Sequence, residues 1–125
     1  MDFVEDIFNQ MGKAIEENGD LKRMIENWHP FDVLFTITDP EMIFTVSIEK
    51  SKLQFIPATK LGKPTAEMIT TFPVLAKLFT GAIDPHKAIF EGELVEVKGS
   101  LLAVQKLKEL MELAFEKIEE NKNQA

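Results

Sequence analysis

Histidine and serine are the first residue types to consider for proton transfer, metal binding or nucleophilic attack, and both are few in this sequence. His29 and His86 each lie beside a proline, and neither has a second metal ligand four residues away or belongs to an HExxH sequence. We therefore interpret His86 as a polar residue at a helix start rather than as a ligand or base. The serines, none of which lies in a G-x-S-x-G sequence, are Ser47, Ser51 and Ser100.

The sequence also contains no complete phosphate-binding loop and no cysteine thiol. The sequence GKPT at residues 62–65 is similar to the end of a P-loop, but the earlier glycine is missing and Pro64 removes one amide donor. The absence of cysteine excludes disulfides and thiolate catalysis. Glu93 and Glu96 lie in an alternating run, so we interpret them as solvated strand residues without a raised pKa. We expect no enzymatic activity, no cofactor and no metal.

The unusual feature of the composition is its deformable apolar bulk, with ten Phe and six Met against one Trp and no Tyr. Each of these residues is most simply interpreted as core, because apolar helix faces are usually just packed. Together they also suit the wall of a cavity for a long apolar ligand, since such a wall must be apolar and adaptable. The candidate wall residues are Phe8, Met11, Met24, Trp28, Phe35, Phe44, Met68, Phe79, Phe90, Leu107, Met111 and Phe115.

Length and charge limit the function further. We expect one domain over residues 1–125, with a frayed tail at 120–125. The net charge of −7 argues against nucleic acid as a partner and against tight binding to anionic membranes. The acidic start MDFVED does not resemble a signal peptide, and no apolar run approaches the ~20 residues of a membrane span. We therefore expect a cytoplasmic protein.

Apolar residues at helical spacing predict two helices in the first part of the chain. The apolar positions of residues 3–17 recur every three or four residues, and the Asn-Gly pair at 18–19 is typical of a helix end. Asp20 is expected to cap a short second helix. Trp28 closes the apolar face of that helix, which ends before Pro30.

The apolar spacing then changes to two and predicts three strands. The runs FDVLFTIT, MIFTVSIEK and KLQFI begin at residues 31, 42 and 52 and place their apolar side chains on one face. A turn at Asp39-Pro40 separates the first two, and Pro57 ends the third. Short connections of this kind favour an antiparallel meander.

Two more strands alternate with helices in the rest of the chain. Residues 65–71 are predicted as a strand, and Pro73 then lies in the first turn of a helix that ends near Thr80. Residues 93–98 form a fifth strand, and a long amphipathic helix follows from Leu101 to about Glu120. The elements together predict an α+β fold with a five-stranded sheet.

Three glycines punctuate the segment LFTGAIDPHKAIFEGELVEVKGS. Gly81, Gly92 and Gly99 each mark a switch between helix and strand, where a positive φ is expected. Asp84 and Pro85 begin a short helical segment between the first two glycines.

This segment, together with the order of elements around it, resembles the sterol-carrier-protein lipid-transfer family. The resemblance covers about residues 31–110. It implies helices over one face of the sheet and, between helices and sheet, an apolar tunnel for a fatty acid, acyl-CoA, sterol or isoprenoid-type lipid. Many members have a glutamine where Lys108 aligns in the last helix. The residues that carry the resemblance are Leu78, Phe79, Thr80, Gly81, Asp84, Pro85, Ala88, Gly92, Leu94 and Gly99.

Two functions follow from these observations and stay open. The first is a non-enzymatic carrier of a long-chain apolar ligand, which makes at most transient contact with membranes. The second is an interaction or regulatory module with a filled core, which docks a partner or forms a homodimer. Binding of a fluorescent fatty acid would separate the two.

Overall fold

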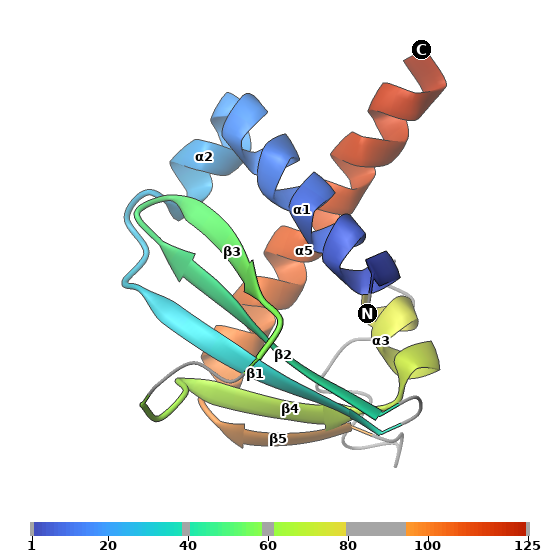
Figure 1. Ribbon diagram of the computed structural model, residues 1–125. Coiled ribbons are helices and arrows are strands. Elements are labelled where there is room, and N and C mark those ends of the chain that lie inside the picture. The colour runs from blue at the N-terminus through green and yellow to red at the C-terminus, as the bar shows by residue number, and fades with distance from the viewer. Residues whose placement is uncertain (1, 39–40, 59–61, 80–94, 125) are drawn as a thin grey trace.

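A computed structural model describes residues 2–38, 41–58, 62–79 and 95–124, and shows a five-stranded sheet with the helices gathered on one face (Figure 1). The predicted α+β class and the five strands are confirmed. In chain order the described elements are α1 (Asp2–Glu17), α2 (Gly19–Ile25), β1 (Phe31–Thr38), β2 (Glu41–Glu49), β3 (Lys52–Ile56), β4 (Ala66–Thr70), α3 (Phe72–Phe79), β5 (Val95–Gly99) and α5 (Leu101–Gln124).

The strands lie in the order β3-β2-β1-β4-β5. Antiparallel pairing of β1 with β2 and of β2 with β3 confirms the predicted meander. β4 pairs with the other edge of β1 in parallel, from Val33 opposite Ala66 to Ile37 opposite Thr70. β5 then adds to β4 in antiparallel fashion, so the sheet is mixed. The three strands of the meander leave that edge of β1 free, which is where the later strands pair.

Side-chain hydrogen bonds fix the connection between β3 and β4. The Thr45 hydroxyl donates to the Ala58 carbonyl oxygen at 2.8 Å, which holds the chain against β2 just after β3 ends. At the start of β4, the Thr65 amide donates to Asp32 Oδ1 at 2.8 Å, and the Asp32 amide donates to Thr65 Oγ1 at 3.2 Å. Residues 62–65 form neither helix nor strand, as the loop interpretation of GKPT predicts.

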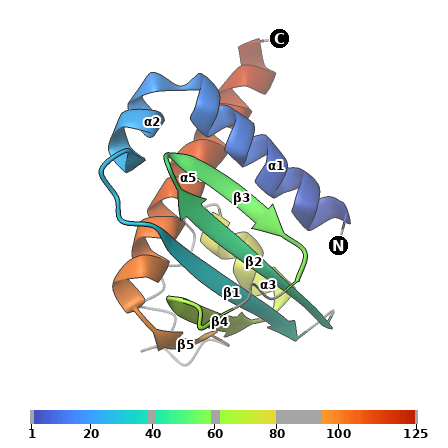
Figure 2. The same cartoon turned by 60° about the vertical axis from the view of Figure 1, so that its left-hand side comes forward.

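Two helices cover the apolar face of the sheet. α1 packs on β3 and α5, and α5 crosses β1 and β4 on the same side (Figure 2). The buried side chains of α1 follow the predicted helical spacing, as Phe8, Met11 and Ile15 show. The core therefore lies between one sheet face and a layer of helices.

The cap of α2 differs from the prediction. The side-chain oxygen of Asn18, rather than Asp20, accepts hydrogen bonds from the amides of Asp20 at 3.1 Å and Leu21 at 3.0 Å. Asp20 lies inside the first turn and forms an ion pair with Arg23 at 2.8 Å. The helix begins two residues earlier than expected because Asn18 has the extended backbone of an N-cap, with φ −112° and ψ 112°.

α5 begins as predicted and ends later. The Ser100 hydroxyl accepts a hydrogen bond from the Ala103 amide at 3.1 Å, which caps the helix. The expected end near Glu120 is wrong, because the helix continues to Gln124, and the frayed tail at 120–125 stays a prediction. The sequence after Glu120 contains neither glycine nor proline to stop the helix. Neither α5 nor any other helix of the described residues is long and apolar enough to cross a bilayer.

Positive φ at a predicted glycine is confirmed for Gly99, where φ is 82°. Gly81 and Gly92, and the short helical segment that Asp84 and Pro85 are expected to begin, lie outside the described residues. The confirmed glycine joins β5 to α5, at the switch between strand and helix.

Candidate functional site

An apolar cavity lies between the sheet and the helices that cover it. Its wall combines residues of β1, β4, α3 and α5. The lining residues are Val33, Phe35, Met68, Leu75, Val104, Leu107, Lys108 and Met111. The cavity has a volume of about 10 Å³, which is room for roughly one water molecule. Among the described residues, the side chains that line this cavity therefore leave little open space between them.

Strand alternation and helical spacing bring these residues together. Val33 and Phe35 are two positions apart on β1 and point to the same face, and Met68 of β4 is the register partner of Phe35. On α5, Leu107 and Met111 are four residues apart and share one face of the helix. The wall is thus built from regular elements rather than from loops.

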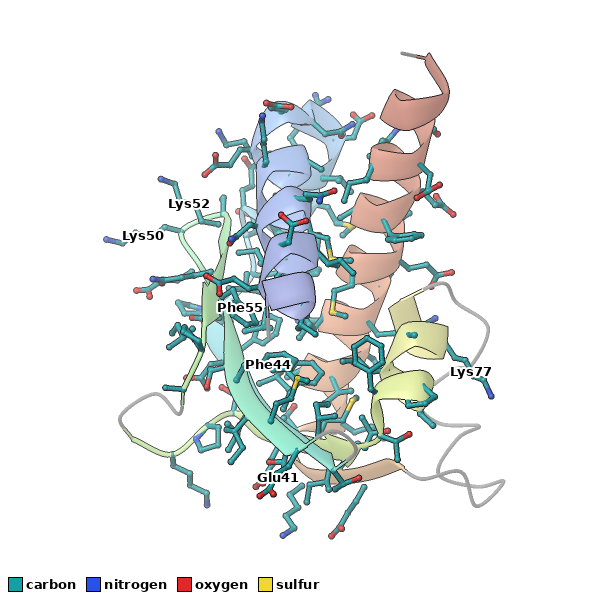
Figure 3. All side chains as sticks on the ribbon, turned by 45° about the vertical axis from the view of Figure 1, so that its right-hand side comes forward. Glu41, Phe44, Lys50, Lys52, Phe55 and Lys77 are labelled. Atoms are coloured by element: carbon teal, nitrogen blue, oxygen red, sulfur yellow. The ribbon has the colours of Figure 1, made fainter. Side chains whose placement is uncertain are left out.

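A cluster of four phenylalanine rings contributes to the same core. Phe44 of β2 lies at its centre, with its ring centroid 4.9 Å from that of Phe35, 5.5 Å from Phe8 and 5.2 Å from Phe55. Phe44 and Phe55 lie on the side of the sheet that faces the helices (Figure 3). Rings at these spacings stabilise one another beyond their burial. The cluster joins α1 to the sheet and supports the Phe35 side of the cavity.

The twelve candidate wall residues fall into four groups. Those that line the cavity are Phe35, Met68, Leu107 and Met111. Those buried in the same core outside the lining are Phe8, Met11 and Phe44. Those partly buried and packed against this core are Met24, Trp28 and Phe115. Those whose side chains lie outside the described part of the chain are Phe79 and Phe90. Contact with a ligand stays a prediction for all twelve.

Four lining residues are not among the predicted wall residues: Val33, Leu75, Val104 and Lys108. Val33 and Val104 follow the apolar spacing of β1 and α5, so this spacing could have identified them. Leu75 belongs to α3, which the tertiary structure places against α5. The predicted wall residues are chosen for their apolar side chains, so the charged Lys108 is not among them.

Lys108 is the one charged residue that the described part of the chain contributes to this lining. Its Nζ atom lies 2.9 Å from Oε2 of Glu112, one turn farther along α5, and the two side chains are 19% and 33% exposed. The ion pairs Arg23–Asp20 and Lys117–Glu120 are more exposed. A lysine so placed lays its methylene stem along the apolar wall and keeps its ammonium group at the rim.

A second hollow, of about 480 Å³, lies beside the turn between β2 and β3. Its mostly polar lining includes Glu16, Glu49, Lys50 and Lys52. Lys50 and Lys52 extend away from the body of the protein (Figure 3). Binding sites for small molecules are mostly apolar with a few polar groups, so the apolar cavity has the more suitable composition.

The described residues contain no group of three or more His, Cys, Asp or Glu side chains that could hold a metal ion. Within the lining of the apolar cavity the charged side chain is that of Lys108, which pairs with Glu112.

Sequence comparison points to a lipid-transfer family. A family model described as the SCP-2 sterol transfer family matches residues 8–112 of this chain. Among curated proteins, no sequence is significantly similar to it. The matched range includes every residue that lines the apolar cavity.

Solved structures share the fold at low sequence identity. The ubiquinone synthesis protein UbiJ-SCP2 superposes with a TM-score of 0.73 at 17% identity, over 87% of this chain and 92% of that one. Sterol carrier protein-2 of Aedes aegypti, in complex with the C16 fatty acid palmitate, superposes with a TM-score of 0.57 at 15% sequence identity. The match covers 84% of this chain and 90% of the Aedes aegypti chain. The sec-alkylsulfatase Pisa1 of Pseudomonas sp. superposes with a TM-score of 0.56 at 18% sequence identity. The match covers 81% of this chain but 13% of the enzyme.

Proposed function

This chain belongs to the SCP-2 sterol transfer family, and we propose that it binds and transfers a long-chain lipid in the space between its sheet and α5. The observation that carries the proposal is the apolar cavity, which lies between the two layers and is closed by side chains of four elements. The palmitate complex of the Aedes aegypti protein supports a ligand with a long alkyl chain in this fold. Fatty acids, acyl-CoAs, sterols and isoprenoid-type lipids are the ligand classes to be tested.

The cavity must enlarge before it can hold such a ligand. Its volume is about 10 Å³, whereas ligand pockets typically measure roughly 300–1,000 Å³. Transfer of each CH₂ group out of water contributes about 0.8 kcal/mol, so a chain of sixteen carbons contributes about 13 kcal/mol. This gain opposes the cost of separating α3 and α5 from the sheet. Binding by displacement of packed helices is favourable when that cost is smaller than about 13 kcal/mol.

A second candidate function is an interaction module that carries no lipid. The small volume of this cavity favours it, because about 10 Å³ among the described residues is what ordinary packing leaves. Such a module would dock a partner or a second copy of the chain through its surface. Two measurements separate this module from the carrier: whether the chain binds lipid, and whether the lipid lies in the apolar cavity.

Met111→Trp is expected to weaken binding of a fluorescent fatty acid at least about tenfold, because the indole takes space that the ligand needs. Met111 is buried and lines the cavity, so the larger ring also overpacks the closed state. We expect the free energy of unfolding to fall by about 1–3 kcal/mol. Urea unfolding and fatty-acid titration of the same preparation measure the two effects.

Leu102→Trp is the matched control for this change. Leu102 lies on the same helix, but its side chain is 61% exposed, so both stability and lipid affinity should stay near those of the parent. Equal affinities of Met111→Trp and Leu102→Trp for the fatty acid would place the ligand elsewhere. Failure of the parent chain to bind any lipid would favour the interaction module.

Trp28 provides an intrinsic signal for movement of α5. Its ring packs on Phe31 at 6.0 Å between centroids, and the Lys106 ammonium lies 5.6 Å from the ring centroid. If lipid entry displaces α5 from the sheet, the polar group above the ring moves and the fluorescence emission of Trp28 shifts. A ligand that binds by calorimetry and leaves the emission unchanged would show that this end of α5 stays in place.

A further inference from the structure

We propose that Lys108 makes this site selective for alkyl chains that end in an anionic group, a fatty-acid carboxylate in particular, over neutral lipids of equal length. This inference rests on the proposed lipid-binding function and specifies the ligand class. The observation behind it is a single lysine in an otherwise apolar wall. Its ammonium group would pair with the carboxylate while the alkyl chain occupies the apolar space.

The placement of Lys108 is that of a headgroup contact. Its side chain is 19% exposed, and it lines the same cavity as Val104 and Met111, which lie four residues before it and three after it on α5. These spacings put the three side chains next to one another on the helix surface. A ligand that enters along this wall keeps its alkyl chain against Val104 and Met111 and its polar end beside Nζ of Lys108.

Glu112 gives Lys108 a partner that an anionic ligand can replace. Removing an ammonium group from water is costly unless the group is paired, and the contact to Glu112 at 2.9 Å provides that pairing. A ligand carboxylate can take the place of Glu112 and preserve the charge-assisted hydrogen bond. Glu112 is 33% exposed, so its carboxylate returns to solvent. A neutral alcohol cannot replace Glu112 in this way.

No second lysine duplicates this contact among the described residues of the wall. Lys106, on another side of α5, lies over the Trp28 ring. Lys77 of α3 extends away from the body of the protein (Figure 3) and is not part of the lining. The net charge of −7 repels anions at long range, so selectivity for an anion depends on this local cation.

The test compares a twelve-carbon fatty acid, laurate, with 1-dodecanol as competitors that displace the uncharged probe diphenylhexatriene at about pH 8, where the free acid is ionised. The parent chain should bind laurate about tenfold more tightly than dodecanol. Lys108→Met preserves the apolar stem and removes the charge, so it should abolish this preference by lowering laurate affinity about tenfold relative to dodecanol affinity. Lys108→Arg should retain the preference.

Two further variants separate a headgroup contact from a helix-surface ion pair. Glu112→Gln removes the competing carboxylate, so laurate affinity should rise while dodecanol affinity stays constant. Lys117→Met breaks the ion pair with Glu120 on the same helix and should change neither affinity. Urea unfolding of each variant reports on the folded state independently of ligand.

The outcomes distinguish this inference from the function on which it rests. Equal binding of laurate and dodecanol by the parent, or loss of affinity for both ligands in Lys108→Met, would overturn the role of Lys108 and leave lipid binding established. Absence of binding for the probe and both lipids would overturn the proposed function and this inference together.

Discussion

Gly99→Ala is expected to lower the free energy of unfolding by about 3 kcal/mol or more, because two independent penalties act at this position. The backbone of Gly99 has φ 82°, a conformation that residues with a Cβ atom adopt only with strain. A Cβ atom built there would also lie 2.6 Å from the Thr65 carbonyl oxygen and 3.1 Å from the Ala66 Cα atom. Thr65 cannot easily move away, since its carbonyl accepts a hydrogen bond from the Ser100 amide at 3.1 Å.

Gly62→Ala is the matched control, because it imposes the backbone penalty without the collision. Gly62 has φ 94°, and no atom lies within 4 Å of an added Cβ. Its expected cost is about 1–2 kcal/mol. Thermal and urea unfolding of both variants measure the difference. Equal costs for the two glycines would show that β4 and β5 separate easily at this junction.

Phe44→Ala is expected to cost about 3–5 kcal/mol, the range for removing a large buried side chain from a packed core. Phe44 is fully buried, and its ring contacts those of Phe8, Phe35 and Phe55. Removing it leaves three rings without their central partner and opens a void between α1 and the sheet. Urea unfolding with circular dichroism detection measures the loss.

The neighbouring residue on β2 provides the control. Ile43 points to the other face of the sheet and is 42% exposed, so Ile43→Ala should cost less than about 1 kcal/mol. A cost below about 1.5 kcal/mol for Phe44→Ala would contradict a packed ring cluster. It would mean that this core is already loose in the empty protein, and that the ligand space extends from the cavity into the rings.

The closed cavity affects how a carrier of this shape would work. In the proposed carrier, release of the lipid would let Val33, Leu75 and Met111 fill the vacated space, so little apolar surface would be exposed there. The consequence is that affinity depends on the cost of separating the layers as well as on the ligand, and variants that loosen the contact between α3 and α5 are expected to bind lipid more tightly.

The local elements could be predicted from the sequence because their signals are short in range. Alternating runs at Phe31–Thr38 and Glu41–Glu49 have one apolar face, and the structure buries that face. Pro73 lies in the first turn of α3, where the missing amide costs nothing. Ser100 caps α5, and Gly99 has the positive φ expected of it. Each of these depends on a few neighbouring residues.

Other local features were ambiguous because two neighbouring residues have the same chemistry. Asn18 and Asp20 are both good N-caps, and the choice between them depends on backbone angles that the sequence does not specify. The end of α5 has no stop signal, so the helix continues past Glu120 to Gln124.

Only the tertiary structure decides which distant segments meet. The parallel pairing of β4 with β1 depends on which sheet edge the meander leaves free. Nothing in the sequence of either strand specifies the strand with which it pairs. The volume of the cavity depends on how residues of four elements interdigitate, among them Leu75 and Met111, which no spacing rule relates. Lys108 joins this wall because α5 packs on β1 and β4, which leaves its side chain 19% exposed. Periodicity identifies the faces that are apolar, and packing between elements determines whether those faces enclose a space and what charge borders it.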